Sequence, residues 1–104
     1  MSEPNIPGSL LVHAAGSVTS AGLNFFLVNA TVTRTGLGIY TIALGTEIAR
    51  DERVIFCQVN ASVARDASVN GAASLPGSFE VRVLTELGGL ADTNFMFVVL
   101  RVIV

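Results

Sequence analysis

The sequence predicts an all-β fold, a two-sheet antiparallel β-sandwich of the jelly-roll kind, on three observations. Glycine and the β-branched residues Val, Ile and Thr are abundant, and apolar residues occur in runs or at every second position. Turn residues interrupt the chain at short intervals. A chain of 104 residues is also long enough for one domain with a single core.

The expected elements follow a short tail. Residues 1–8 are expected to form an extended tail broken by prolines, before a single domain over residues 9–104. Seven strands are expected, at residues 9–15, 22–34, 37–44, 53–63, 65–70, 78–86 and 93–104. Turn signals separate them, at residues 16–17, 36–38, 45, 70–71, 76–77 and 88–89. The charged segment 46–53 is expected to be a solvated connection, with a ligand site as the alternative.

The expected strands differ in the character of their two faces. In the segment 78–86, Phe79, Val81 and Val83 alternate with polar residues, which predicts one face in the core and one in water. Four other segments are apolar on both faces: residues 10–12, 25–28, 54–57 and 95–104. A two-layer sandwich covers only one face of each strand from within. The four segments therefore predict one sheet whose outer face is covered by something else.

Self-association is the cover that we expect. Charged residues make up only 13% of the chain, against about 25% in a typical soluble protein. Leaving the alternate apolar side chains of residues 96–102 in water would forfeit roughly 6–12 kcal/mol, at about 1.5–3 kcal/mol each. The expected oligomer interface consists of Leu11, Met96, Val98, Leu100 and Val102. The alternative cover is the chain's own loops or helices, for which few residues are left.

Charge and composition argue against several other classes of protein. The formal net charge is −2 and the six arginines are scattered, so we expect no nucleic-acid partner. The first seven residues lack the basic start and apolar run of a signal peptide. The apolar stretch 95–104 is half the length of about 20 residues that a membrane helix needs. We therefore expect no membrane insertion, and a virion-associated or cytoplasmic location.

Few residues suit catalysis, and we expect no enzyme, catalytic residue, metal site or cofactor. His13 is the only histidine, and we expect it to be packed or hydrogen-bonded, with a pH-sensitive contact near a subunit interface as the alternative. Cys57 is the only cysteine, so no internal disulfide can form, and its apolar surroundings predict a small core residue. The chain has no Trp and one Tyr, whereas enzymes acting on sugars usually carry aromatic platforms.

A ligand site, by contrast, belongs in the loops at the ends of the sheets. The longest expected loop is residues 63–77, in which Arg65, Asp66 and Asn70 are the candidate ligand contacts. The alternative for this segment is an ordinary solvated loop.

Three stretches resemble a known family. They are TRTGLGIYTI at residues 33–42, SFEVRV at residues 78–83 and DTNFMFVV at residues 92–99. They resemble the trimeric jelly-roll heads of the C1q and tumour-necrosis-factor type, most closely those in phage tail-fibre tips and bacterial structural proteins, over about residues 16–104. The resemblance implies a homotrimer whose inner sheet contains the first and last strands and faces the threefold axis, and it implies no catalytic residues.

These observations lead to an expected function. We expect a non-enzymatic homotrimeric module, a structural or receptor-recognising component of a phage-like or bacterial assembly. Its partners would be further copies of itself and a glycan or cell-surface receptor. A small carbohydrate-binding lectin is the alternative.

Overall fold

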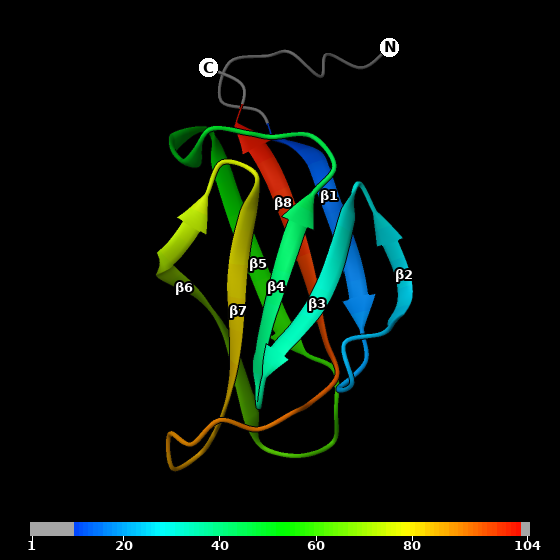
Figure 1. The fold of residues 1–104 in the computed structure, drawn as a ribbon, viewed down its shortest axis with the longest axis vertical. Coiled ribbons are helices and arrows are strands. Elements are labelled where there is room, and N and C mark those ends of the chain that lie inside the picture. Colours follow the sequence, from blue (N-terminus) through cyan, green and yellow to red (C-terminus); the bar gives the residue numbers. More distant parts are fainter. Residues whose placement is uncertain (1–9, 103–104) are drawn as a thin grey trace.

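Two four-stranded antiparallel sheets pack face to face, as the sequence predicts (Figure 1). The computed structural model describes residues 10–102, so the expected tail at residues 1–8 lies outside the described residues. The strands are β1 (Leu10–Val18), β2 (Asn24–Val28), β3 (Ala30–Gly36), β4 (Ile39–Leu44), β5 (Arg53–Val59), β6 (Arg65–Leu75), β7 (Ser78–Thr85) and β8 (Phe95–Val102). The first sheet has the order β2-β1-β8-β5 and the second sheet has the order β3-β4-β7-β6.

The core lies between the two sheets. Phe95 and Phe97 of the first sheet meet Tyr40 and Phe79 of the second, with ring centroids 4.8 Å apart for Tyr40–Phe95 and 5.8 Å for Phe79–Phe97. In β7, Phe79 and the valines at 81 and 83 are buried whereas Arg82 is exposed. The alternation expected for this strand is confirmed.

The four segments that are apolar on both faces belong to β1, β2, β5 and β8, and these strands form one sheet. This confirms the prediction that a single sheet carries all the two-sided strands. The alternation in β8 is also as expected, with Phe95, Phe97 and Val99 buried and Met96 exposed. β8 lies between β1 and β5, and β1 and β8 are the two central strands of the sheet (Figure 1).

The single strand expected at residues 22–34 is instead two strands in different sheets. β2 belongs to the first sheet and β3 to the second, and Asn29 between them has a φ of 54°. Asn tolerates this left-handed conformation better than most residues. The Asn29 side-chain amide donates to the backbone carbonyl oxygen of His13 at 3.0 Å, and the backbone carbonyl oxygen of Asn29 accepts from the backbone amide of Gly45 at 2.9 Å. These bonds fix the crossing between the sheets.

Two expected turns are also absent. β1 continues through Gly16 and Ser17, where a turn was predicted, because Gly16 serves close packing: a Cβ atom there would lie 2.6 Å from both Leu27 and Phe97. The strand expected at residues 65–70 is confirmed as the first part of β6, but the turn expected at residues 70–71 is absent. β6 continues to Leu75, with its pairing to β7 interrupted between Asn70 and Leu75, so most of the loop expected over residues 63–77 is strand. Turn-forming residue types thus occur here within strands.

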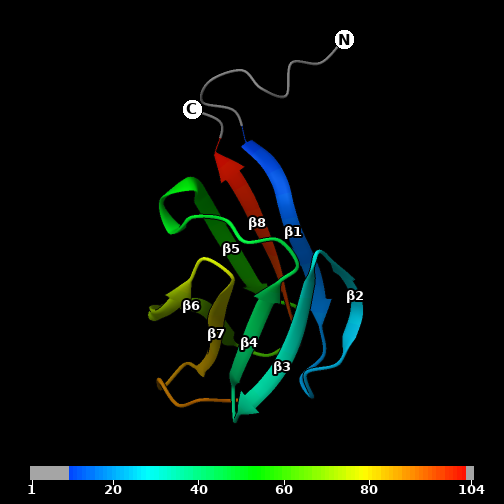
Figure 2. The same ribbon diagram turned by 45° about the horizontal axis from the view of Figure 1, so that its top comes forward.

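The charged connection before β5 is solvated, as expected. It contains one turn of 3-10 helix, η1 (Arg50–Glu52), with no buried residue. Among the described residues, no helix is long and apolar enough to cross a membrane. Figure 2 shows that β1, β8 and β5 project beyond the second sheet at their ends nearest the charged connection before β5.

Candidate functional site

The outer face of the first sheet is built from apolar side chains across all four strands. Side chains that lie directly opposite in an antiparallel pair point to the same face. Val12, Leu100 and Val54 form one such row, and Ala15, Val98 and Phe56 form the next. The outer face comprises Leu10, Val12, Ala15, Ser17, Phe26, Val28, Val54, Phe56, Gln58, Met96, Val98, Leu100 and Val102. No side chain in this set carries a charge.

Much of this outer face is open to solvent in the single chain. Val12 is 65% exposed, Phe56 57% and Phe26 53%. A shallow groove of about 430 Å³ lies on the face, and its walls include Phe26, Phe56 and Met96. Large contiguous apolar patches are uncommon on soluble monomers and mark interaction surfaces. The face is thus suited to packing against another protein surface.

Four of the five residues expected at an oligomer interface lie together on the outer face: Met96, Val98, Leu100 and Val102. Leu11 does not, because it pairs with Arg101, which points to the opposite side of the sheet. Leu10 and Val12 take its place. Residues 10–12 are all apolar, so the sequence does not show which face each side chain occupies. The pairing register of β1 with β8 shows it.

The outer face of the second sheet is polar by comparison. Arg82 and Glu80 form an ion pair at 2.6 Å, and the Asn70 side-chain amide donates to Glu80 at 3.1 Å. Threonines and serines of β3, β4 and β6 occupy other positions on this face. The outer face of the second sheet is therefore suited to contact with water, whereas the outer face of the first sheet is not.

The candidate ligand contacts Arg65, Asp66 and Asn70 lie along β6 and not in a loop. Asp66 and Asn70 point to the outer face of the second sheet, whereas Arg65 is on the other side of the strand. Asn70 is already hydrogen-bonded to Glu80. Arg65 and Asp66 both line a small pocket beside Thr85 and Glu86, but Asn70 does not, so the three side chains do not form one site.

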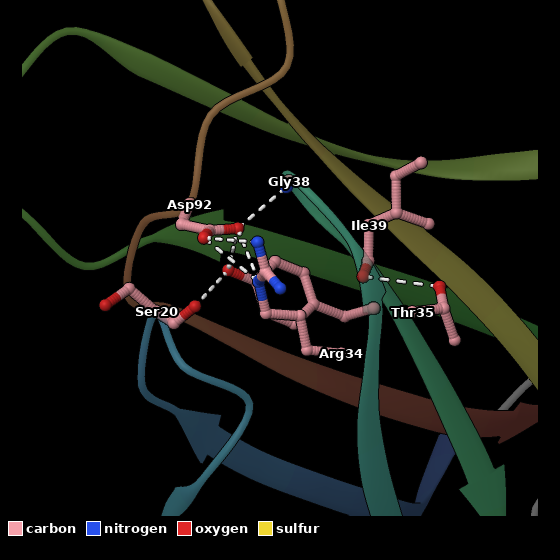
Figure 3. Close-up of polar contacts among 7 residues, drawn as sticks. Ser20, Arg34, Thr35, Gly38, Ile39 and Asp92 are labelled. Atoms are coloured by element: carbon pink, nitrogen blue, oxygen red, sulfur yellow. Dashed lines mark hydrogen bonds and ion pairs between the residues drawn. The ribbon is translucent and has the colours of Figure 1, made fainter.

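A polar cluster around Asp92 ties together the connections at one end of the sandwich (Figure 3). The Asp92 carboxylate accepts from Arg34 at 2.8 Å, from the amide of Gly38 at 2.7 Å and from the Tyr40 hydroxyl at 3.2 Å. The Tyr40 hydroxyl also lies 2.7 Å from the carbonyl oxygen of Ser20. The sequence does not predict this cluster, because its members are distant along the chain.

The charges of the cluster are matched to one another. The hydrogen bond from Arg34 lowers the pKa of Asp92 below its ordinary value, against the opposing effect of burial. Burial, and then the negative charge of Asp92, raise the pKa of Tyr40 to about 12. At neutral pH Asp92 is therefore ionised and Tyr40 is protonated, so the hydrogen bonds of the cluster stabilise the fold.

His13 and Cys57 have structural environments. His13 Nε2 lies 2.7 Å from the carbonyl oxygen of Thr46, which confirms that the ring is hydrogen-bonded. Cys57 packs against the core, and burial, followed by the nearby charge of Asp66, raises the pKa of its thiol. Over residues 10–102, no group of three His, Cys, Asp or Glu side chains is placed to hold a metal ion.

Comparison of the chain with protein-family models, curated proteins and solved structures found no match. The class of the molecule therefore follows from its own geometry. It is a two-sheet antiparallel β-sandwich, compatible with a jelly-roll-like fold.

Proposed function

We propose that this protein is a non-enzymatic homo-oligomeric module that assembles through the outer face of its first sheet. One observation carries the proposal: the thirteen residues of that face span four strands without a charge. Charged residues are depleted in the same way at the cores of protein–protein interfaces. Assembly hides the apolar groove, and the polar second sheet remains in water.

The energetics favour a cover for this face. Val12, Phe26 and Phe56 each expose more than half of their surface in the single chain. Complete burial of such a side chain contributes about 1.5–3 kcal/mol, so covering the exposed part of these three contributes about 3–5 kcal/mol. A second copy of the same face supplies a matching uncharged surface.

A trimer is the form of oligomer that we propose. The resemblance to trimeric C1q-type and tumour-necrosis-factor-type heads implies an inner sheet containing the first and last strands. In this chain β1 and β8 pair with each other at the centre of the first sheet, which supports the proposal. In a trimer, the polar sheets and loops present three identical surfaces, and weak contacts to a receptor or a structural partner add through multivalency. The role proposed is a structural or receptor-recognising component of a phage-like or bacterial assembly.

Light scattering on a sizing column tests the proposal. The expected result is a particle with three times the chain mass of 10.8 kDa. A monomer at all accessible concentrations would contradict self-assembly. A stable dimer would retain the interface but contradict the threefold arrangement.

A further inference from the structure

A groove with two arginines lies where the edge strands β5 and β6 face each other. Its walls are Arg50, Arg53, Ile55, Val69 and Ser74, and its volume is about 260 Å³. The groove opens beside the stretch of β6 between Asn70 and Leu75 where pairing with β7 is interrupted. It is large enough for a small molecule and combines a cationic end with an apolar wall.

The backbone of β6 holds both guanidinium groups in place. Arg53 Nη1 donates to the carbonyl oxygen of Leu75 at 2.8 Å, and Arg50 Nη2 donates to that of Gly71 at 3.5 Å. The Arg53 guanidinium also lies 6.0 Å from the centre of the Phe79 ring. A guanidinium has five N–H donors, and these contacts, with one from Arg53 to the carbonyl oxygen of Pro76 at 3.4 Å, use a minority of them.

Neither arginine of this groove forms an ion pair within the described residues. The ion pairs formed there are Arg34–Asp92 and Arg82–Glu80, and neither includes Arg50 or Arg53. Asp51 and Glu52 follow Arg50 in the chain, but both are exposed and neither forms an ion pair there.

Two further observations concern the arginines of the groove. Arg101 lies directly opposite Arg53 in the pairing of β5 with β8, which adds a third cation at this end of the sheet. Burial, followed by the charge of Arg50, lowers the pKa of Arg53, as expected where like charges lie close together. An anion in the groove would relieve this repulsion.

We propose that the groove binds a small organic carboxylate, with its anionic group on Arg50 and Arg53 and its apolar body against Ile55 and Val69. A planar carboxylate matches the paired donors of a guanidinium, and the aliphatic wall favours a ligand with a carbon body over a bare inorganic anion. Arg53 and Ile55 point away from the outer face of the first sheet, because they alternate with Val54 and Phe56. The groove therefore stays open in the proposed oligomer, and the inference does not depend on that oligomer.

Titration of the ¹⁵N-labelled full chain by NMR tests the inference. The probes are benzoate, its uncharged analogue benzamide, and inorganic phosphate, all at constant ionic strength. Benzoate is expected to shift the amide signals of Ile55, Val69 and Ser74 saturably. Benzamide and phosphate are each expected to bind at least about tenfold more weakly, because one lacks the charge and the other lacks the carbon body.

Arg50→Gln is the informative variant, because Arg50 is exposed and its hydrogen bond to Gly71 is long, at 3.5 Å. We expect it to weaken benzoate binding by about tenfold or more. Arg82→Gln makes the same change of charge on the other sheet, and its affinity for benzoate should equal that of the wild type. Light scattering of Arg50→Gln should give the wild-type mass, which separates this test from the test of assembly.

Four results would overturn the inference. They are no saturable response to benzoate, equal binding of benzamide, phosphate binding as tight as benzoate binding, and unchanged benzoate affinity in Arg50→Gln.

Discussion

Asp92 connects parts of the chain that are far apart in sequence. Its carboxylate accepts hydrogen bonds from Arg34 of β3, from the β3–β4 turn at Gly38 and from Tyr40 of β4, and Asp92 itself lies in the connection before β8. Hydrogen bonds to an ionised group contribute more than those between neutral groups, about 1.5–3 kcal/mol each. One carboxylate therefore fixes the relative positions of three segments.

We expect Asp92→Ala to lower the free energy of unfolding by about 1–3 kcal/mol at pH 7. Because the pKa of Asp92 is lowered on folding, its stabilisation is complete above the unfolded value of about 3.9 and is lost as the pH falls through the folded value. The difference between variant and wild type should therefore shrink below about pH 4. Urea unfolding at several pH values measures it, with the exposed Asp51→Ala as control. An unchanged difference in acid would contradict the electrostatic explanation.

Gly38 offers a second test at the scale of one residue. Its φ is +68°, and an added Cβ would lie 2.7 Å from the amide nitrogen of Ala91 and 2.8 Å from the carbonyl oxygen of Val83. Both contacts are to backbone atoms, so a change of side-chain conformation cannot relieve them.

We expect Gly38→Ala to destabilise the fold by more than about 2 kcal/mol. Gly88→Ala is the matched control, because Gly88 has a φ of +86° but no atom lies within 4 Å of an added Cβ. The control should cost only the backbone term of about 1–2 kcal/mol. Thermal unfolding of both variants measures how much stability each loses. Equal losses would show that the backbone contacts at Gly38 add nothing to the cost of the substitution.

At the scale of elements, the strands that carry long apolar runs could be predicted from the sequence. The hydrophobic pattern identified β1, β2, β5 and β8 as members of one sheet, because a strand that is apolar on both faces needs cover on both. The point where the chain changes sheets could not be predicted. Asn29 ends the apolar run at residues 25–28, but a polar residue between two strand-like segments does not by itself indicate a change of sheet. The pairing of β2 and β3 with different sheets and the φ of Asn29 show the crossing.

The candidate sites were also predictable only in part, because they depend on which strands pair and in which register. The two-residue period of a strand placed Met96, Val98 and Leu100 on one face of β8, and the structure agrees. Leu11 has apolar neighbours on either side, so its face depended on a pairing register that the sequence does not display. The arginine groove depends on the approach of β6 to the start of β5, a contact between distant segments.

The crossing at Asn29 is testable by a pair of substitutions. Asn29→Val places a β-branched residue at a φ of 54° and removes the hydrogen bond to His13, and we expect a loss of about 2–3 kcal/mol. Asn29→Gly removes the same hydrogen bond but adopts this φ freely, so about 1 kcal/mol should be lost. Equilibrium denaturation compares the two. Equal stability of the variants would show that the backbone conformation contributes nothing.

At the scale of the whole molecule, the two sheets have opposite surfaces, and this sets the direction of assembly. Leu100→Asp places a charge at the centre of the uncharged outer face, opposite both Val12 and Val54. We expect it to dissociate the oligomer, because an unpaired charge is too costly to bury in an interface. Light scattering should then give the mass of a single chain.

Arg82→Asp is the control for that variant, because it changes the charge on the polar face of the second sheet. It should assemble as the wild type does. Normal assembly of Leu100→Asp would place the interface elsewhere on the molecule.

The position of β8 has a consequence for synthesis. β8 is the last described strand in chain order, yet it lies between β1 and β5, and β5 has no other neighbour in its sheet. On the ribosome β1, β2 and β5 are made first, and their apolar faces have no partner until β8 emerges. The first sheet is therefore completed only after every other described strand has been made, through pairing between segments far apart in the chain. Until that pairing forms, the apolar segments of β1, β2 and β5 are open to aggregation.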